Sequence, residues 1–474
     1  MNQTPSDPAY ANSKREAGAT AHPIATIAAT ILGSSLAFID GSVVNVALPT
    51  LARAFDASPA DLSWTINAYL LPLGALILLG GAAGDHFGRR RLFQLGIVLF
   101  LIASVLCAVA PSLDLLLAGR GLQGLGAALL LPNSLALLGA SFSGKERGRA
   151  IGTWAAAGAI AGAAGPLIGG WIVDHFGWRP IFLVNLPIGA GAAWLAARYV
   201  DESRERREGA RLDWSGGIVV TLGLGLLVWA LTAAADPATP RGVLLAVLLM
   251  GIANIALFTW IEARQGIDAL MPLGLFGTAT FAGLSLLTFF LYAALGGLIV
   301  LLPFVLIRVG GYSGVEAGAA MLPLPIVIGA GSRLMGSVAA KLGGRLLLSS
   351  GALVVAAGLA LYARIGAGDI DYWRNILPPT LLVAIGMAIC VAPLTTLVMG
   401  SVDADHVGAA SGFNSALARI GGLIATALLG FVFAAGDSDA LLLGRVHAAA
   451  LAGAACSAFA AVCAFALIRK PGSG

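Results

Sequence analysis

Fourteen apolar runs of about 20 residues or more dominate the sequence, and each can cross the ~30 Å hydrocarbon layer of a membrane as one α-helix. The apolar residues within a run are continuous and do not alternate with polar ones, as the strands of a membrane β-barrel would require. We therefore predict an all-α membrane protein with fourteen transmembrane helices. The predicted spans are 24–49, 60–82, 92–110, 113–138, 150–172, 179–199, 214–235, 242–262, 279–303, 315–338, 344–363, 376–398, 408–434 and 446–468.

The composition excludes most other classes of protein. Charged residues make up 11% of the chain, against roughly 25% in an average soluble domain. So few charges cannot cover a water-facing surface, which excludes a soluble enzyme, a nucleic-acid-binding protein and a disordered scaffold. The four cysteines lie inside apolar runs, where they are expected to be small buried side chains rather than disulfides or metal ligands.

The distribution of lysine and arginine predicts the orientation. An even number of spans puts both termini on one side, and positively charged loops favour the cytoplasm. With the N-terminus inside, 18 of the 28 lysines and arginines fall in cytoplasmic segments, seven in outer segments and three within spans. We therefore predict a multi-pass membrane protein with both termini in the cytoplasm. Its first 22 residues are polar and are expected to form a disordered cytoplasmic tail.

A weak internal repeat predicts two similar halves. The segment GAAGDHFGRRRL at 81–92 matches GSVAAKLGGRLL at 336–347 when the chain is shifted by 255 residues. Two repeats that enclose a site near the membrane midplane are typical of alternating-access transporters. The predicted organisation is a tail at 1–22, a six-helix half at 23–200, a charged cytoplasmic linker at 201–213, a two-helix insert at 214–278 and a second six-helix half at 279–474.

Four stretches carry a resemblance to a known family. They are IDGSVVNVALP at 39–49, GAAGDHFGRRRL at 81–92, GRGLQGLGAA at 119–128 and GPLIGG at 165–170. Their order and spacing resemble the major facilitator superfamily and, within it, the fourteen-span drug:proton antiporters of multidrug efflux. The chain departs from the family patterns at Ala83, where Leu is usual, at Ala161, where Gly is expected, and at Ala340, where the corresponding first-half loop has an acid.

The resemblance implies a function. It is proton-coupled export of amphipathic small molecules or drugs across the bacterial inner membrane by alternating access. The alternative is a dedicated exporter of one natural product or metabolite that confers self-resistance. The partners would be a lipophilic or amphipathic substrate, protons and membrane lipids, but no nucleic acid. No cofactor is expected beyond the proton gradient. We expect a monomer and leave open whether accessory envelope proteins assist it.

Asp40 is the acidic residue placed deep within a predicted span, and a carboxylate at such depth is a functional candidate. Counting along the helices puts Asp40 about 13 Å and Arg120 about 10 Å below the outer surface, so the two can pair if spans 1 and 4 are neighbours, as in the family. Burial disfavours an ionised carboxyl group and a nearby arginine favours it. We interpret the two residues as the proton-coupling pair; the alternative is a structural clasp.

Six further residues are candidates for the substrate cavity: Asn45, Tyr69, Gln123, Phe290, Asn414 and Arg419. Gln123 lies one turn from Arg120 and can share its face, whereas Asn45 lies off the face of Asp40. Interhelical hydrogen bonds are the alternative role for both. Arg419 lies about 18 Å into its span, too deep to reach the surface easily. Lipid or core packing is the alternative role of the aromatic residues.

Two motifs are expected to control access. Asp85, Gly88 and the three arginines Arg89, Arg90 and Arg91 would form a cytoplasmic gate, in which Gly88 allows the tight turn. The resemblance places Asp85 against the start of span 13, where a helix N-terminus stabilises a carboxylate. The alternative role of the arginines is to fix topology.

The second motif is Gly165, Pro166, Gly169 and Gly170 in span 5, which resembles the antiporter signature. Its small residues allow close helix packing. The resemblance implies that this face also keeps the transport path tight against proton leak.

The spans hold no combination of residues that predicts an enzyme. The segment GASFSGKE at 139–146 nearly matches a phosphate-binding loop, but Glu146 replaces the required hydroxyl residue and no strand precedes it. No nucleophile with its base and no metal-ligand cluster is found among the spans. A channel is the remaining alternative, and it would not need a pair such as Asp40 and Arg120.

Overall fold

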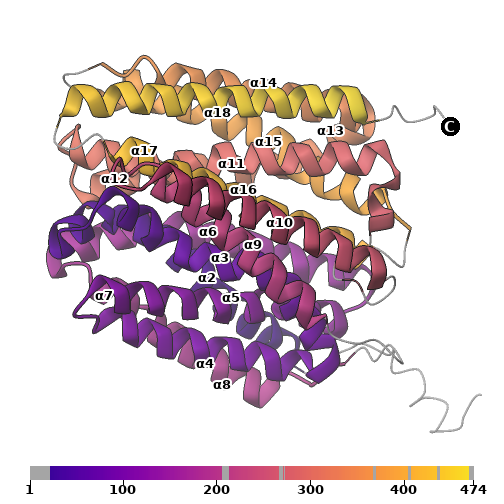
Figure 1. Cartoon of the computed structure of the whole chain (residues 1–474). Coiled ribbons are helices and arrows are strands. Elements are labelled where there is room, and N and C mark those ends of the chain that lie inside the picture. Colours follow the sequence, from indigo (N-terminus) through magenta and orange to yellow (C-terminus); the bar gives the residue numbers. More distant parts are fainter. Residues whose placement is uncertain are drawn as a thin grey trace, which may run out of the picture.

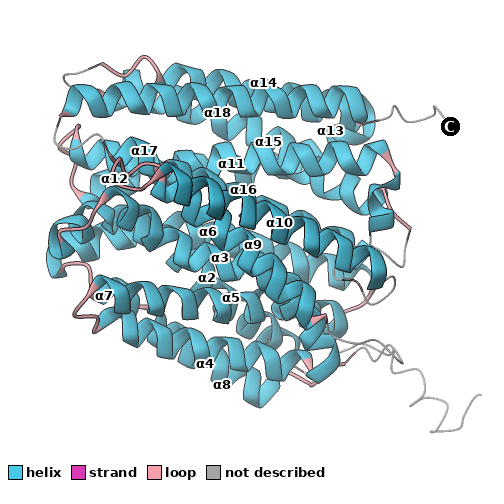
Figure 2. Ribbon diagram, viewed as in Figure 1, coloured by secondary structure: helices cyan, strands magenta, loops and turns pink. Residues whose placement is uncertain are grey.

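The computed structural model describes residues 22–204, 213–265, 269, 271, 273–366, 370–403, 407–434 and 438–468. Fourteen helices in these ranges are long and apolar enough to cross a membrane, which confirms the predicted number of spans. Every regular element in the described ranges is helical (Figure 2). The tail at 1–21 and most of the linker, at 205–212, lie outside the described residues.

Each predicted span corresponds to one long helix or to two short helices in line. The first half consists of α2 (Pro23–Phe55), α3 (Pro59–Phe87), α4 (Arg89–Ala108), α5 (Leu113–Ser141), α6 (Gly144–Phe176), α7 (Pro180–Leu183) and α8 (Asn185–Tyr199). The insert consists of α9 (Trp214–Ala233) and α10 (Arg241–Gln265), followed by η2 (Leu273–Gly277). The second half consists of α11 (Ala279–Arg308), α12 (Gly314–Met321), α13 (Pro323–Leu342), α14 (Gly344–Tyr362), η3 (Tyr372–Ile376), α15 (Leu377–Gly400), α16 (Val407–Leu428), α17 (Gly430–Phe433) and α18 (Asp439–Leu467).

The two halves lie side by side, and the insert lies across their boundary (Figure 1). Helix α9 packs against α3 of the first half and α16 of the second, and α10 packs on the outside of α9. Much of the surface of α10 is exposed and apolar, including Leu245, Ile252 and Trp260. An exposed apolar surface on a helix of this length suits contact with lipid.

We call one end of the bundle the outer end, because the distribution of arginine and lysine predicts that it faces out of the cell. At this end α2, α4 and α6 finish and α3, α5 and α12 begin. It lies at the left of Figure 1, where α7 and α12 are labelled. The opposite end is called the inner end.

The repeat seen in the sequence has counterparts in local structure. Ser58 before α3 and Ser313 before α12 each form a capping box with an acidic residue three positions later. Gly88 before α4 and Gly343 before α14 both have positive φ, 114° and 80°, a conformation that glycine adopts without strain. Both pairs are 255 residues apart, the shift that aligns the two halves.

Several helices extend a few residues beyond the predicted spans, and the last span shows the largest difference. The last span begins at Asp439 rather than near 446, because Ser438 caps the helix by accepting a hydrogen bond from the backbone N–H of Leu441 at 3.3 Å. Arg445 therefore lies within α18, where it donates to the carbonyl oxygen of Phe431 at 2.6 Å.

Candidate functional site

Asp40 lies in the middle of α2 with none of its surface exposed. Its Oδ2 forms an ion pair with Nη1 of Arg120. Its Oδ1 accepts hydrogen bonds from Nε2 of Gln123 at 2.9 Å and from Nδ2 of Asn185 at 3.2 Å. Both oxygens of this buried carboxylate therefore have partners, as a charge in a low-dielectric interior requires.

Arg120, only 1% exposed, joins three helices of the first half. From α5 it reaches Asp40 on α2, and its Nε donates to the carbonyl oxygen of Thr65 on α3 at 3.2 Å. Its guanidinium also lies 4.5 Å from the ring centroid of Tyr69, a cation–π contact. The pairing of Asp40 with Arg120 agrees with the similar depths expected from the sequence.

Gln123 extends this network to α4. Its Nε2 also donates to Oγ of Ser104 at 2.9 Å, and its Oε1 accepts from Nη1 of Arg120 at 2.8 Å. The thiol of Cys107 approaches the same Oε1 at 3.6 Å. We call Asp40, Arg120, Gln123, Asn185 and Ser104 the carboxylate network. It draws on α2, α4, α5 and α8, all in the first half.

Asn185 and Ser104 were not among the residues predicted from the sequence. Asn185 begins α8 at the break in the sixth span and is 1% exposed. Its Oδ1 is buried without a hydrogen-bond partner among the described residues. A polar amide within an apolar span was the available signal, but only the packing of α8 against α2 shows that it reaches Asp40.

The other candidate cavity residues lie apart from the carboxylate network, except for Tyr69. Asn45 is buried on α2, but no described hydrogen bond joins it to Asp40. Asn414 accepts a hydrogen bond from Thr288 at 2.5 Å. Phe290 packs edge-on against Phe459, with ring centroids 4.9 Å apart. The contacts of Asn414 and Phe290 stay within the second half.

Arg419 lies on α16, where that helix contacts α3 of the first half. A β-carbon placed on Gly74 would be 3.5 Å from Cβ of Arg419. The guanidinium is within electrostatic range of Tyr69 and Tyr292. No hydrogen bond or ion pair of Arg419 is found in the described part of the chain, so it is a cation without a direct partner at the boundary between the halves.

The loop between α3 and α4 is fastened to the end of the first half. Asp85 pairs with Arg89 at 2.7 Å. Glu202, which the sequence analysis did not single out, accepts hydrogen bonds from the backbone N–H groups of Arg90 at 3.0 Å and Arg91 at 3.3 Å. The carboxylate of Glu202 thus caps the N-terminus of α4, where negative charge is favourable.

The expected contact of Asp85 with the start of α16 stays a prediction. None of the hydrogen bonds found among the described residues joins Asp85 to α16. The side chains of Val407 and Gly408, where α16 begins, lie outside the described residues.

The glycine-rich face of α6 contacts both halves. A β-carbon at Gly165 or Gly169 would collide with Ser42 or Val43 of α2, and one at Gly170 would collide with the backbone of Gly314 in α12. In the inner half of α6 a β-carbon at Gly152 would meet no atom within 4 Å, whereas one at Gly158 would collide with Phe38 of α2. The glycine of this face that touches α12 is thus Gly170, near the outer end.

A carboxylate reinforces the contact at the outer end. Asp174 of α6 accepts hydrogen bonds from the backbone N–H groups of Gly314 at 3.0 Å and Val315 at 2.9 Å. The helices are also close at Gly318 of α12, where an added β-carbon would lie 2.4 Å from the carbonyl oxygen of Pro166 in α6. We call this contact between α6 and α12 the outer seal.

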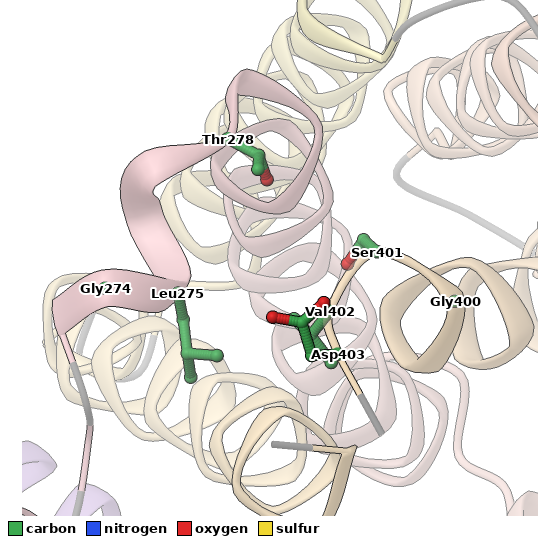
Figure 3. A pocket seen from close by; sticks show the side chains of 7 residues that line it. All are labelled: Gly274, Leu275, Thr278, Gly400, Ser401, Val402 and Asp403. Atoms are coloured by element: carbon green, nitrogen blue, oxygen red, sulfur yellow. The ribbon is translucent and has the colours of Figure 1, made fainter. Parts of the chain in front are cut away.

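A separate pocket of about 390 Å³ lies at the inner end of the second half (Figure 3). It is lined by residues of η2, by the N-cap residue of α11, by the last residue of α15 and by the segment that follows: Gly274, Leu275, Thr278, Gly400, Ser401, Val402 and Asp403. It contains none of the candidate site residues. Among the described residues, no group of three histidine, cysteine or acidic side chains is placed to hold a metal ion.

Comparison with known proteins decides the family. A model of the Major Facilitator Superfamily matches residues 30–426. The chain belongs to this superfamily. The multidrug resistance protein Stp of Mycobacterium tuberculosis is 35% identical over 411 residues, which cover 86% of this chain and 76% of Stp. The methylenomycin A resistance protein of Bacillus subtilis is 32% identical, with 86% and 87% of the two chains covered.

The structural comparison agrees on the fold. A crystal structure of a D-xylose–proton symporter has a TM-score of 0.67 and 17% sequence identity, with 94% of this chain and 97% of that chain covered. The chain is therefore a multi-pass membrane protein of a transporter superfamily and a member of its multidrug efflux family, as the motifs predicted. The members of this superfamily are transporters rather than enzymes.

Proposed function

We propose that the protein exports amphipathic small molecules or drugs across the bacterial inner membrane by alternating access, in exchange for protons. The observation that carries the proposal is the buried carboxylate network, which holds one titratable carboxyl group against one arginine. Relatives named for multidrug resistance and for tetracenomycin C resistance and export support drugs as the cargo. Both termini would lie in the cytoplasm.

Proton exchange at Asp40 would change the charge that holds three helices together. While Asp40 is ionised, Arg120 connects α2, α3 and α5. Protonation would leave Arg120 as a buried cation without a countercharge, held only by neutral acceptors such as the carbonyl of Thr65 and Oε1 of Gln123. An unpaired charge in such a place is costly, so protonation would favour a rearrangement of these helices.

The outer seal supports an inward-facing arrangement of the halves. In this arrangement the substrate enters between the two halves from the inner end of the bundle. Arg419 lies at the boundary between α3 and α16. We further propose that Asp85 and the loop arginines form the inner gate, and that Asp85 exchanges Arg89 for the N-terminus of α16 when the inner side closes.

Reconstitution in proteoliposomes tests this function. With a pH-sensitive dye in the lumen, an imposed substrate gradient should move protons in the opposite direction, and an imposed pH gradient should concentrate substrate. Counterflow of labelled substrate, which needs no net proton movement, identifies a carrier rather than a channel. Substrate movement without proton movement would contradict the coupling, and failure to transport any amphipathic compound would contradict export.

The runner-up is a dedicated exporter of one natural product. Relatives named for methylenomycin A resistance and cephamycin export favour it at similar identity, 32% in both cases. A resistance screen with a pump-deficient strain separates the two functions. Protection against several unrelated compounds supports multidrug export, and protection against one compound supports the dedicated exporter.

A further inference from the structure

Two acidic side chains are buried together at the inner end of the insert, far in sequence from the carboxylate network. Asp213 precedes α9 and is 4% exposed; Glu262 lies in the last turn of α10 and is 1% exposed. The two carboxyl groups are within hydrogen-bonding reach of each other. Neither residue belongs to a motif used in the proposed transport mechanism.

Each carboxyl group uses only one of its oxygens for donors. Oδ1 of Asp213 accepts from Ser215 Oγ at 2.7 Å, from the backbone N–H of Gly216 at 2.8 Å and from Gln265 Nε2 at 2.7 Å. Oε2 of Glu262 accepts from the backbone N–H of Met271 at 2.6 Å. The remaining oxygens, Asp213 Oδ2 and Glu262 Oε1, are buried and have no donor among the described residues.

These two unpartnered oxygens face the same point. A β-carbon on Gly216 would lie 2.9 Å from Glu262 Oε1 and closer still to Asp213 Oδ2. Two ionised carboxylates that face each other in a buried place repel strongly, so such a pair binds a proton. A proton on one oxygen turns the repulsion into a hydrogen bond and gives both buried oxygens a partner.

Helix geometry decides which residue carries the proton. Asp213 caps the N-terminus of α9, where the helix dipole favours a negative charge, whereas Glu262 is near the C-terminus of α10, where the dipole opposes one. Burial alone would raise the pKa of Asp213, but the hydrogen bonds from Gln265, Gly216 and Ser215 lower the pKa below its usual value. Asp213 is thus the ionised partner.

Other charged groups of the described chain do not compensate the pair. From α3, the side chains that reach this end of α9 are the apolar Leu76 and Leu79, beside Gly217. On α10, Arg264 lies 3.9 Å above the ring of Trp260. Asp213 is the one charged group in the described residues whose field acts on Glu262.

We propose that Glu262 and Asp213 form a proton-binding site of the insert, in which Glu262 holds one proton at neutral pH and donates it in a hydrogen bond to Asp213. The bound proton fastens α10 to α9. Because Glu262 also binds the backbone of Met271, it fastens the segment that leads into the second half as well. Loss of the proton in alkaline conditions brings two negative charges together and loosens the insert.

Thermal unfolding of the purified full chain in detergent, measured as a function of pH, tests the site. Wild type should lose several degrees of melting temperature as the pH rises from neutral into the alkaline range. Glu262→Gln replaces the acidic proton with an amide that donates at every pH, so this loss should disappear. Exposed Glu146, in the first turn of α6, supplies the matched control: Glu146→Gln should retain the wild-type profile.

Infrared spectroscopy gives a second readout that does not depend on stability. The carbonyl band of a protonated carboxyl group should be present at neutral pH and weaker in Glu262→Gln, but unchanged in Glu146→Gln. An identical alkaline profile in wild type and Glu262→Gln, or an unchanged band, would overturn the proposal. Stabilisation of wild type by added Na⁺ or Mg²⁺ that Glu262→Gln lacks would also overturn it, in favour of a metal cation between the carboxylates.

Discussion

The carboxylate of Asp174, near the end of α6, accepts a hydrogen bond at 3.0 Å from the backbone N–H of Gly314, the first residue of α12. A second bond from the N–H of Val315 makes the carboxylate a bridge from the first half to a helix N-terminus of the second. Beside it, Gly170 and Gly314 are in backbone contact, so any larger residue would push the two helices apart. The outer seal thus combines a charge at a helix end with a close contact between glycines.

Asp174→Asn should weaken the outer seal without unfolding either half. The amide keeps the size of the side chain but loses the charge, which at a helix N-terminus is worth about 0.3–1 kcal/mol. The outward-open population should therefore rise by roughly two- to fivefold.

Spin labels at the exposed residues Arg53 and Trp373, one in each half at the outer end, report the separation of the two halves. Asp114→Asn, at the same end but exposed and on one half only, should leave the distance distribution unchanged; an equal change in both variants would contradict the assignment.

Asp40→Asn should abolish transport driven by a pH gradient while the protein still inserts into the membrane. Asparagine has nearly the same volume and still accepts a hydrogen bond from Arg120, but it does not titrate. Counterflow, which needs no net proton movement, should survive in part. The measurement is substrate accumulation in proteoliposomes with and without a pH gradient, with Asp114→Asn as control. Normal pH-driven accumulation by Asp40→Asn would show that coupling occurs elsewhere.

Apolar runs and charge counts were enough to predict the fourteen spans, because the membrane demands long uninterrupted helices. The pairing of Asp40 with Arg120 needed two premises: their depths could be counted along the helices, and the family resemblance made spans 1 and 4 neighbours. The places of Asn185 and Ser104 in the network did not follow, because their helices reach it only through packing. Asn185 donates to Asp40, and Ser104 accepts hydrogen bonds from Gln123 and Asn185. Nor did the outer seal: Asp174 lies just beyond the predicted end of its span.

Glu262 shows a different limit of sequence reasoning. Glu262 is the last residue of the predicted span 242–262, and nothing in the sequence distinguished it from other charged residues at helix ends. Its burial depends on the fold of the segment around Met271 and on Asp213, which is 49 residues earlier in the chain. Contacts between helix ends that are far apart in the chain produce no periodic pattern in the sequence.

Gly88→Ala should destabilise the protein by about 1–3 kcal/mol. Gly88 has φ of 114°, and its β-carbon would lie 2.8 Å from Cδ of Glu202, the carboxylate that caps α4. Gly162→Ala is the matched control, because Gly162 lies inside α6 with no atom within 4 Å of an added β-carbon. It should be neutral or stabilising by up to ~1 kcal/mol. Thermal unfolding in detergent measures both variants, and equal stability of the two would contradict the role given to the Gly88 turn.

The charges of Asp40, Arg120 and Arg419 predict a preference for the charge of the substrate. The one carboxylate in the carboxylate network is Asp40, already held by Arg120, while Arg419 is a cation without a direct partner at the boundary of the halves. A bivalent cation entering between the halves would be repelled by Arg419 and would find Asp40 engaged, and an unpaired charge in a low-dielectric cavity is costly. We therefore predict better export of neutral, monocationic or acidic amphipathic compounds than of bivalent quaternary cations.

Efflux of a matched pair of monovalent and bivalent dyes measures this preference for substrate charge. Arg419→Gln should narrow the difference between the dyes, because it removes the repulsion and keeps a polar side chain. Equal or better transport of the bivalent dye by wild type would mean that a second acidic group reaches the cavity.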